Sequence, residues 1–205
     1  MLKSKKFLIP FIAVVALICV FGIILLIDSL SPAVSKEEWQ STPELALKRE
    51  VEYGAENIGT AKTEDVLSVA LMLDKLEFAD TNTLYAIFLS KADIFTIAKL
   101  TKDAATGKWK YHSTLFYEKD LANSTCIYNA QNPDRTLTKD HFKDAENGYI
   151  LGLKFRDGAT VRVNNTPAKM KTYGFQINGT DYSLDLWYVS ENIPEEDLCI
   201  QYKSR

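Results

Sequence analysis

The sequence predicts an α+β protein with an N-terminal transmembrane helix, then one helix packed on an antiparallel sheet, and then a β-rich C-terminal unit. Three observations favour this fold class. The 205-residue chain has an uncharged apolar stretch near its N-terminus, at residues 7–27. A segment with the apolar spacing of a helix follows it. Most of the remaining chain shows the alternation or the short apolar runs that are typical of strands.

The apolar stretch is long enough to cross a membrane. As a helix, its 21 residues would span about 32 Å at ~1.5 Å per residue, and a bilayer hydrocarbon core is about 30 Å thick. Lys3, Lys5 and Lys6 precede it, and positive residues favour the cytoplasmic side. We therefore expect a single-pass cell-membrane protein with a cytoplasmic N-terminus and the bulk of the chain outside.

The alternative reading of the stretch is a cleaved secretory signal. Ala33 and Ser35 would place small residues before a cut. The apolar cores of such signals are roughly 7–15 residues long, which is shorter than the stretch found here. The length therefore favours an uncleaved anchor.

The expected organisation has a cytoplasmic tail at 1–6, the anchor at 7–27, a tether at 28–41, an α+β ectodomain unit at 42–124 and a β-rich ectodomain unit at 125–205. Ser, Pro and charged residues make a packed element in the tether unfavourable. The residues beyond the anchor suffice for one ordinary domain or two small ones.

The charge of the chain argues against a nucleic-acid partner. All 27 acidic residues but only 21 of the 24 basic ones follow the anchor, so this part carries a net charge of −6. Nucleic-acid binders normally present a basic face. We therefore expect partners at the membrane, such as another envelope protein or a cell-wall component.

The first predicted helix of the ectodomain covers residues 43–57. Thr42 is a suitable N-cap and Pro43 suits the first helical position. Apolar side chains recur at helical spacing at Leu47, Val51, Ala55 and Ile58. Gly59 is the expected stop.

Four segments after this helix predict an antiparallel meander. Residues 66–78 read as a strand whose parity changes near Leu76, which predicts a bulge or break. Residues 83–91 are apolar on both parities, as in a central strand covered on both faces. Residues 94–102 and 108–118 complete the meander. In the last segment the alternation predicts one shared face for Trp109, Tyr111, Leu115 and Tyr117.

The C-terminal half reads as short strands separated by hairpin signals. The turn pairs are Asp157-Gly158, Asn164-Asn165 and Asn178-Gly179. Residues 138–147 are interpreted as one short helix. Residues 193–205 are interpreted as one helical turn followed by an edge strand.

No catalytic, metal or cofactor motif is present, and we expect none of these groups. The two histidines, His112 and His141, lie at no ligand-like spacing from a cysteine or from each other. Each is interpreted as a surface residue. The alternative role for the protein is an extracytoplasmic hydrolase that uses carboxylates with His112 or His141.

Aromatic residues supply the candidates for an interface. Tyr182 and Tyr188 could contact a partner, because aromatic residues are enriched at interfaces. Trp109 and Trp187 lie in alternating strands and are expected in the core. Trp39 follows the anchor closely, where an aromatic ring can rest at the lipid headgroups.

A disulfide between Cys126 and Cys199 is predicted. These are the only cysteines outside the anchor, in a compartment that permits oxidation. Such a bridge would contribute up to ~4.4 kcal/mol by restricting the unfolded chain. The alternative is two separate buried thiols.

In general character the chain is similar to small single-pass exported bacterial proteins whose outer domain binds or assembles a partner. The sequence therefore favours a membrane-anchored extracytoplasmic binding or assembly module without catalytic activity. Two other hypotheses stay open: the hydrolase described above, and the sensing part of an envelope signalling complex.

Overall fold

The structure is a computed structural model that describes residues 36–78, 81–124, 127–129, 131, 140–144, 149–154, 159–190 and 198–203. The predicted anchor at 7–27 lies outside these residues. Within the described ranges, no helix is long and apolar enough to cross a bilayer. Residues 36–205 form one compact unit.

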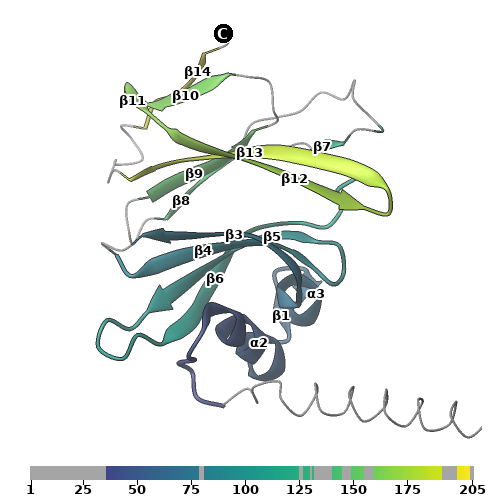
Figure 1. Ribbon diagram of the computed structural model, residues 1–205, viewed down its shortest axis with the longest axis vertical. Coiled ribbons are helices and arrows are strands. Elements are labelled where there is room, and N and C mark those ends of the chain that lie inside the picture. The colour runs from purple at the N-terminus through teal and green to yellow at the C-terminus, as the bar shows by residue number, and fades with distance from the viewer. Residues whose placement is uncertain are drawn as a thin grey trace, which may run out of the picture. The chain divides into compact units, whose positions relative to one another are not determined.

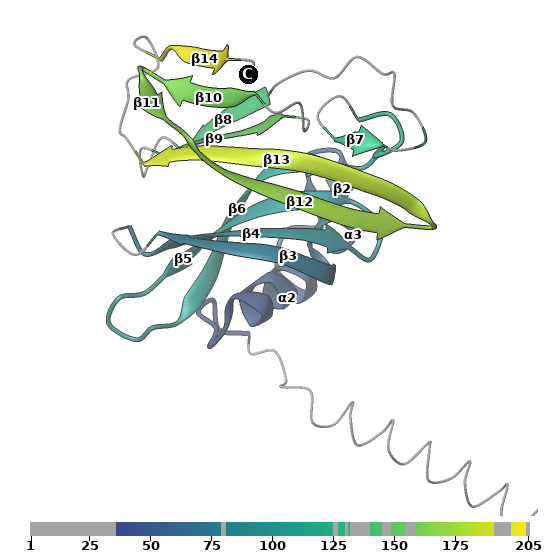
Figure 2. The ribbon, with the colours of Figure 1, turned by 45° about the horizontal axis from the view of Figure 1, so that its top comes forward.

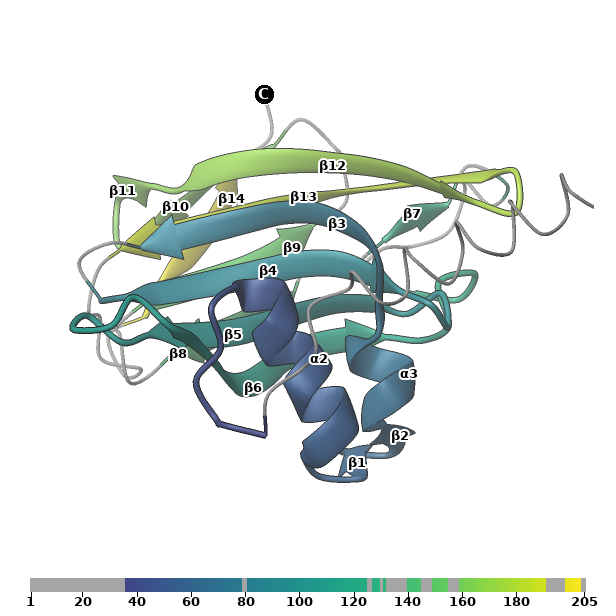
Figure 3. The same cartoon turned by 60° about the horizontal axis from the view of Figure 1, so that its bottom comes forward.

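This unit is built in layers, with helices on one side of a stack of sheets (Figure 1). The first sheet is an antiparallel meander. Its strands, in spatial order, are β3 (Val69–Phe78), β4 (Thr83–Ser90), β5 (Phe95–Lys102) and β6 (Trp109–Glu118). The helices α2 (Pro43–Tyr53) and α3 (Thr63–Leu67) cover its outer face (Figure 3). A small hairpin of β1 (Asn57–Ile58) and β2 (Ala61–Lys62) joins the helices.

The second sheet covers the other face of the first, and a third sheet lies beyond it (Figure 2). The second sheet runs in the order β12 (Lys169–Ile177), β13 (Thr180–Ser190), β9 (Tyr149–Lys154) and β8 (Asp140–Asp144), and β7 (Tyr128–Asn129) also pairs with β13. The third sheet has the order β11 (Thr166–Pro167), β10 (Thr160–Val163) and β14 (Ile200–Lys203). The protein is therefore α+β and rich in β-sheet, with few helices in its described part.

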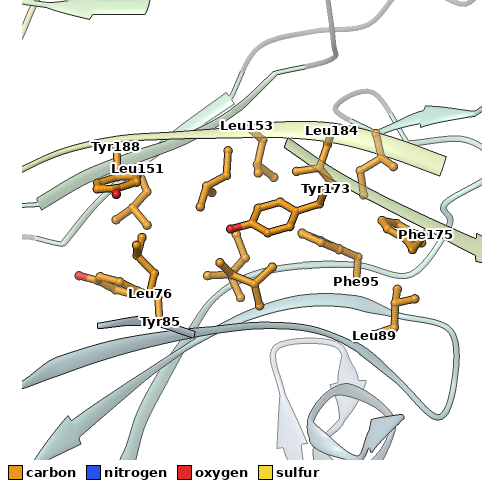
Figure 4. Packing of buried hydrophobic residues seen from close by; sticks show 14 of the residues in the cluster. Leu76, Tyr85, Leu89, Phe95, Leu151, Leu153, Tyr173, Phe175, Leu184 and Tyr188 are labelled. Carbon is orange, nitrogen blue, oxygen red and sulfur yellow. The ribbon is translucent and has the colours of Figure 1, made fainter. Parts of the chain in front are cut away.

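Hydrophobic cores fill the spaces between adjacent layers. Leu47 of α2 packs with Phe88 and Leu100 of the first sheet. The core between the first and second sheets contains the rings of Tyr85, Phe95, Tyr173, Phe175 and Tyr188 (Figure 4). A smaller core between the second and third sheets surrounds Trp187. The two ectodomain units predicted at 42–124 and 125–205 therefore share a core.

Strand β4 is covered on both faces, which explains why apolar residues occupy both its even and its odd positions. All of its side chains, from Thr83 to Ser90, are buried, because α2 and α3 cover one face of the first sheet and the second sheet covers the other. The prediction of a central strand covered on both faces is confirmed. The predicted irregularity of the preceding strand is also confirmed, since the pairing of β3 with β4 shifts register twice before Asp74.

Bulges correct one detail of β6. The alternation predicted that Leu115 shares a face with Trp109, Tyr111 and Tyr117. The pairing of β5 with β6 shifts register on both sides of the Ser113–Thr114 pairings. As a result Leu115 packs against the core between the sheets, whereas Trp109, Tyr111 and Tyr117 face the helices. A bulge adds a residue that simple alternation does not count.

The N-terminus of α2 agrees with the prediction, but its C-terminus differs. The Thr42 hydroxyl accepts a hydrogen bond from the Leu45 N–H at 3.2 Å, as an N-cap does. The helix ends at Tyr53 with Gly54 as its C-cap, four residues earlier than predicted. Gly59, the expected stop, lies instead in the β1–β2 turn with a φ of 58°, which is a conformation that favours glycine.

The hairpin signals of the C-terminal half agree with the structure where it describes them. Asn164 and Asn165 have φ values of 46° and 68°, and Asn178 and Gly179 have φ values of 49° and 79°. Two successive positive φ values are required by the tight turns whose twist matches that of the flanking strands. The helix predicted at 138–147 is wrong, because Asp140–Asp144 is strand β8. Its backbone pairs with β9, and that tertiary pairing overrides a local preference.

Candidate functional site

A buried lysine lies at the centre of the candidate site. Strand β5 is apolar from Phe95 to Leu100 except at Thr96 and Lys99. Lys99 is only 2% exposed. Its Nζ lies 2.9 Å from Oδ1 and 2.8 Å from Oδ2 of Asp144 on β8, so the ion pair joins the first sheet to the second.

A tyrosine completes what we call the inner cluster: Tyr85, Lys99 and Asp144. The Tyr85 hydroxyl donates a hydrogen bond of 2.6 Å to Asp144 Oδ2, and Tyr85 is fully buried. Removing two charges from water is costly unless each is paired and hydrogen-bonded. The bidentate contact of Lys99 and the hydroxyl of Tyr85 together satisfy the buried carboxylate.

The inner cluster opens on a recess of about 320 Å³, which we call the Lys99 recess. Its described lining residues supply ammonium, imidazole, hydroxyl and indole groups; they are Trp39, Thr81, Thr83, Lys99, Thr101, Lys110 and His112. Antiparallel pairing gathers them, because Thr83 lies opposite Thr101 on β5 and Thr101 lies opposite Lys110 on β6. The recess is thus built on the ends of three adjacent strands.

The segment that precedes α2 forms one wall of the recess. Gln40 and Trp109 exchange backbone hydrogen bonds of 2.7 and 2.6 Å, which add Gln40 to the edge of β6. Glu38 lies 3.1 Å from Lys110 Nζ, and the same ammonium lies 5.2 Å from the centre of the Trp39 ring. Residues 36–40, which we call the clamp segment, are therefore fixed to the folded unit, although they were predicted to belong to a tether.

The described lining of the recess donates more hydrogen bonds than it accepts. Lysine ammonium groups only donate, whereas threonine hydroxyls and a neutral imidazole can do both. No carboxylate is present among the described residues that line the recess. The complementary ligand is therefore rich in acceptors, as the oxygens of a phosphate or a carboxylate are.

The two histidines do not form a described catalytic arrangement. His112 is exposed and lines the Lys99 recess. The backbone of His141 lies in β8 opposite Gly152, and the side chain lies outside the described residues. Among the described residues, no group of three or more His, Cys, Asp or Glu side chains gathers in a metal-binding arrangement.

A second polar cluster joins the same two sheets at another place, with the roles of the sheets reversed. Asp74 lies on β3 of the first sheet. Lys171 and Tyr173 on β12 of the second sheet each donate a hydrogen bond to its Oδ2, at 2.7 and 2.6 Å. We call Asp74, Lys171 and Tyr173 the outer cluster, because 41% of the Lys171 side chain and 23% of the Asp74 side chain are exposed.

Opposing effects set the pKa values of the outer cluster. Partial burial by itself raises the pKa of the Asp74 carboxyl. The hydrogen bonds from Lys171, Tyr173 and the Lys75 N–H favour the carboxylate and outweigh burial, so the pKa of Asp74 is lowered. Burial and the neighbouring Asp74 carboxylate both raise the pKa of Tyr173, which therefore stays a hydrogen-bond donor.

The aromatic residues proposed from the sequence lie in or against cores. Trp109 and Trp187 are 7% and 0% exposed, which confirms the prediction that both are core residues. Tyr188 is buried and packs edge-on against Phe78, and Tyr182 packs against the same core. These ring contacts are made within the chain, so an interface at Tyr182 and Tyr188 stays a prediction without support from a described contact.

Only one cysteine of the predicted disulfide lies among the described residues. Cys199 is exposed and precedes β14, and its backbone N–H donates to Asn164 Oδ1 at 2.7 Å. Cys126 lies outside the described residues. The disulfide between Cys126 and Cys199 therefore stays a prediction.

The inner cluster was not predicted from the sequence. The available signal was Lys99 itself, a charged residue inside an apolar strand segment, since such a position requires a buried partner. The identity of that partner could not be read from the sequence, because Asp144 is 45 residues away and belongs to a different sheet.

Comparison of the chain with models of protein families, with curated proteins and with solved structures finds no match. The function is therefore inferred from the Lys99 recess and from the sequence alone.

Proposed function

We propose that this protein is a single-pass, membrane-anchored extracytoplasmic module that binds an acceptor-rich group in the Lys99 recess without transforming it. The observation that carries the proposal is the convergence of Lys99, Lys110, His112 and three threonines on one opening. The uncharged stretch at 7–27, preceded by lysines, supports the anchor and its orientation.

The geometry supports binding better than hydrolysis. A hydrolase needs a nucleophile or general base placed against the reacting group. The described lining of the recess includes no carboxylate to act with His112, and the one carboxylate of the inner cluster, on Asp144, is engaged by Lys99 and Tyr85. Such a site can hold an anionic group of an envelope protein or a cell-wall component.

Short-range hydrogen bonds must provide most of the affinity. The part of the chain beyond the anchor has a net charge of −6, so its long-range field does not attract an anion. Hydrogen bonds between an ammonium group and an oxyanion are about twice as strong as those between neutral groups. We therefore expect binding to depend on individual donors of the recess.

A photo-crosslinking experiment in intact cells tests this proposal. A photoreactive amino acid replaces His112 in the full-length protein, and a matched variant carries it at Gln201, which is exposed on β14 of the third sheet. We expect a discrete crosslinked product from the His112 position that is weaker or missing at Gln201. Equal products at both positions, or none at either, would contradict a binding site in the recess.

A further inference from the structure

We infer that the ligand of the Lys99 recess is the phosphate of an anionic phospholipid headgroup in the membrane that anchors the chain. This inference rests on the proposed function, because it requires the anchor at residues 7–27. The clamp segment is central to this inference, since its contacts attach it to the folded unit and its Trp39 lines the recess.

A short stretch of sequence separates the predicted anchor from the described part of the folded unit. Gln40 is hydrogen-bonded to Trp109, and its Nε2 donates to the Glu37 carbonyl at 2.5 Å. The Glu37 carboxylate lies 3.3 Å from Lys108 Nζ. The described part of the folded unit starts at Lys36, and residues 28–35 separate it from the predicted span in the sequence. Eight residues extend over at most about 30 Å.

The contacts of the clamp segment and the lining of the recess share two residues. Lys110 contacts Glu38 and Trp39 of the clamp segment, and both Lys110 and Trp39 line the recess. The recess therefore includes a residue, Trp39, that follows the predicted span at 7–27 by only 12 residues in the sequence. Tryptophan and lysine are also the residues that commonly contact the headgroup region of a membrane.

The donors that line the recess suit the oxygens of a headgroup phosphate. A headgroup phosphate offers acceptor oxygens to the Lys110 ammonium, the Thr101 hydroxyl and the His112 imidazole. The present partner of Lys110 is Glu38, whose side chain is 58% exposed. An exposed ion pair of this kind is weak, so a phosphate can replace the Glu38 carboxylate as the acceptor. Lys99 stays bound to Asp144 and supplies the floor of the site.

Amine labelling of the full chain in nanodiscs tests the inference. The protein is reconstituted in discs of zwitterionic phosphatidylcholine and in discs that also contain anionic phosphatidylglycerol. An amine-reactive reagent is applied at fixed pH, and mass spectrometry gives the labelling rate of each lysine. We expect Lys110 to be labelled several-fold more slowly in the anionic discs, whereas Lys169 and Lys203, in the second and third sheets, change much less.

A second arm identifies the source of the phosphate. Glycerol phosphate is added to the protein in the zwitterionic discs. If it protects Lys110 as well as the anionic lipid does, the site takes a soluble or polymer-borne phosphate, and the lipid inference is overturned although the recess still binds. If neither protects Lys110, the recess does not bind phosphate and the inference is also overturned.

A pair of variants separates the recess from a general effect of surface charge. Thr101→Val combined with His112→Ala removes donors of the recess and keeps Lys110, and we expect it to abolish most of the protection. The control is Thr160→Val on β10, where the hydroxyl contacts the Lys203 carbonyl and not the recess; it should keep full protection. Equal protection in both would overturn the inference. The N-terminal peptides in the same spectra report independently whether the anchor is retained.

Discussion

The inner and outer clusters use the same three side-chain types in opposite surroundings. Each has an aspartate that accepts hydrogen bonds from a lysine and a tyrosine of the facing sheet. In the inner cluster the lysine and aspartate side chains are 3% and 4% exposed, against 41% and 23% in the outer cluster. The same contacts should therefore contribute very differently to stability and to function.

Desolvation explains the difference. Water can solvate the groups of the outer cluster when one of them is removed, whereas it has little access to the inner cluster. A buried charge that loses its partner keeps its full desolvation penalty. The inner cluster thus makes the two sheets depend on one another, and it holds an ammonium group at the floor of the Lys99 recess.

The largest expected effect is that of Asp144→Ala. It leaves the Lys99 charge buried without its carboxylate, and we expect the free energy of unfolding to fall by about 3–5 kcal/mol, measured by urea denaturation. The double variant Lys99→Met, Asp144→Leu removes both charges and should recover most of this loss. A double variant as unstable as Asp144→Ala would show that packing, and not the unpaired charge, causes the loss.

The two tyrosines provide the next comparison. Tyr85→Phe removes a hydrogen bond to a buried carboxylate, and a hydrogen bond to a charged group contributes about 1.5–3 kcal/mol to stability. Tyr173→Phe removes the equivalent bond to Asp74, which water can replace in part. Chemical denaturation of both variants should therefore show the larger loss for Tyr85→Phe. Equal losses would mean that exposure does not distinguish the clusters.

Removing the lysine of the outer cluster should have a small effect. Lys171→Met breaks a partly exposed ion pair, and we expect a loss of no more than about 1 kcal/mol in urea denaturation. The matched change in the inner cluster, Lys99→Met, removes the ammonium group that neutralises the buried Asp144 carboxylate, and it should cost several times more. The comparison fails if the two variants are equally stable.

Acid should weaken the outer cluster in a defined direction. The pKa of Asp74 is lowered below its ordinary value of 3.8 in the folded protein. The carboxylate therefore stabilises the fold fully above that value, and this contribution is lost as the pH falls through the lower folded-state pKa. Denaturation curves between pH 5 and about 2 should show a smaller loss of stability for Asp74→Asn than for the unmodified protein. Identical pH profiles would contradict the lowered pKa.

The smallest expected effect on stability is that of His112→Ala. Because His112 is exposed at the recess, its replacement should change the free energy of unfolding by no more than about 0.5 kcal/mol. A larger loss, measured by thermal or urea unfolding, would place His112 in a structural network and would renew the case for the hydrolase.

The sequence determined the local features that depend on short-range physics. Thr42 specified the start of α2 because a hydroxyl can cap the free backbone N–H groups of a helix. The Asn-Asn and Asn-Gly pairs specified two hairpins because few residues tolerate successive positive φ values. Apolar residues at both even and odd positions of β4 specified a strand covered on both faces, because apolar side chains on each face of a strand require a cover that excludes water.

Tertiary structure decided the features that depend on long-range pairing. Leu115 changed face because of bulges that alternation does not register, and Asp140–Asp144 became a strand because β9 lies beside it. The lining of the Lys99 recess likewise combines distant parts of the chain: Trp39 forms one wall, and the other described lining residues lie between residues 81 and 112. The stacking of the two sheets brings Asp144 to Lys99. Hydrogen bonds and charge interactions depend on distances of a few ångströms in space and not on separation along the chain, so local sequence could not predict this pair.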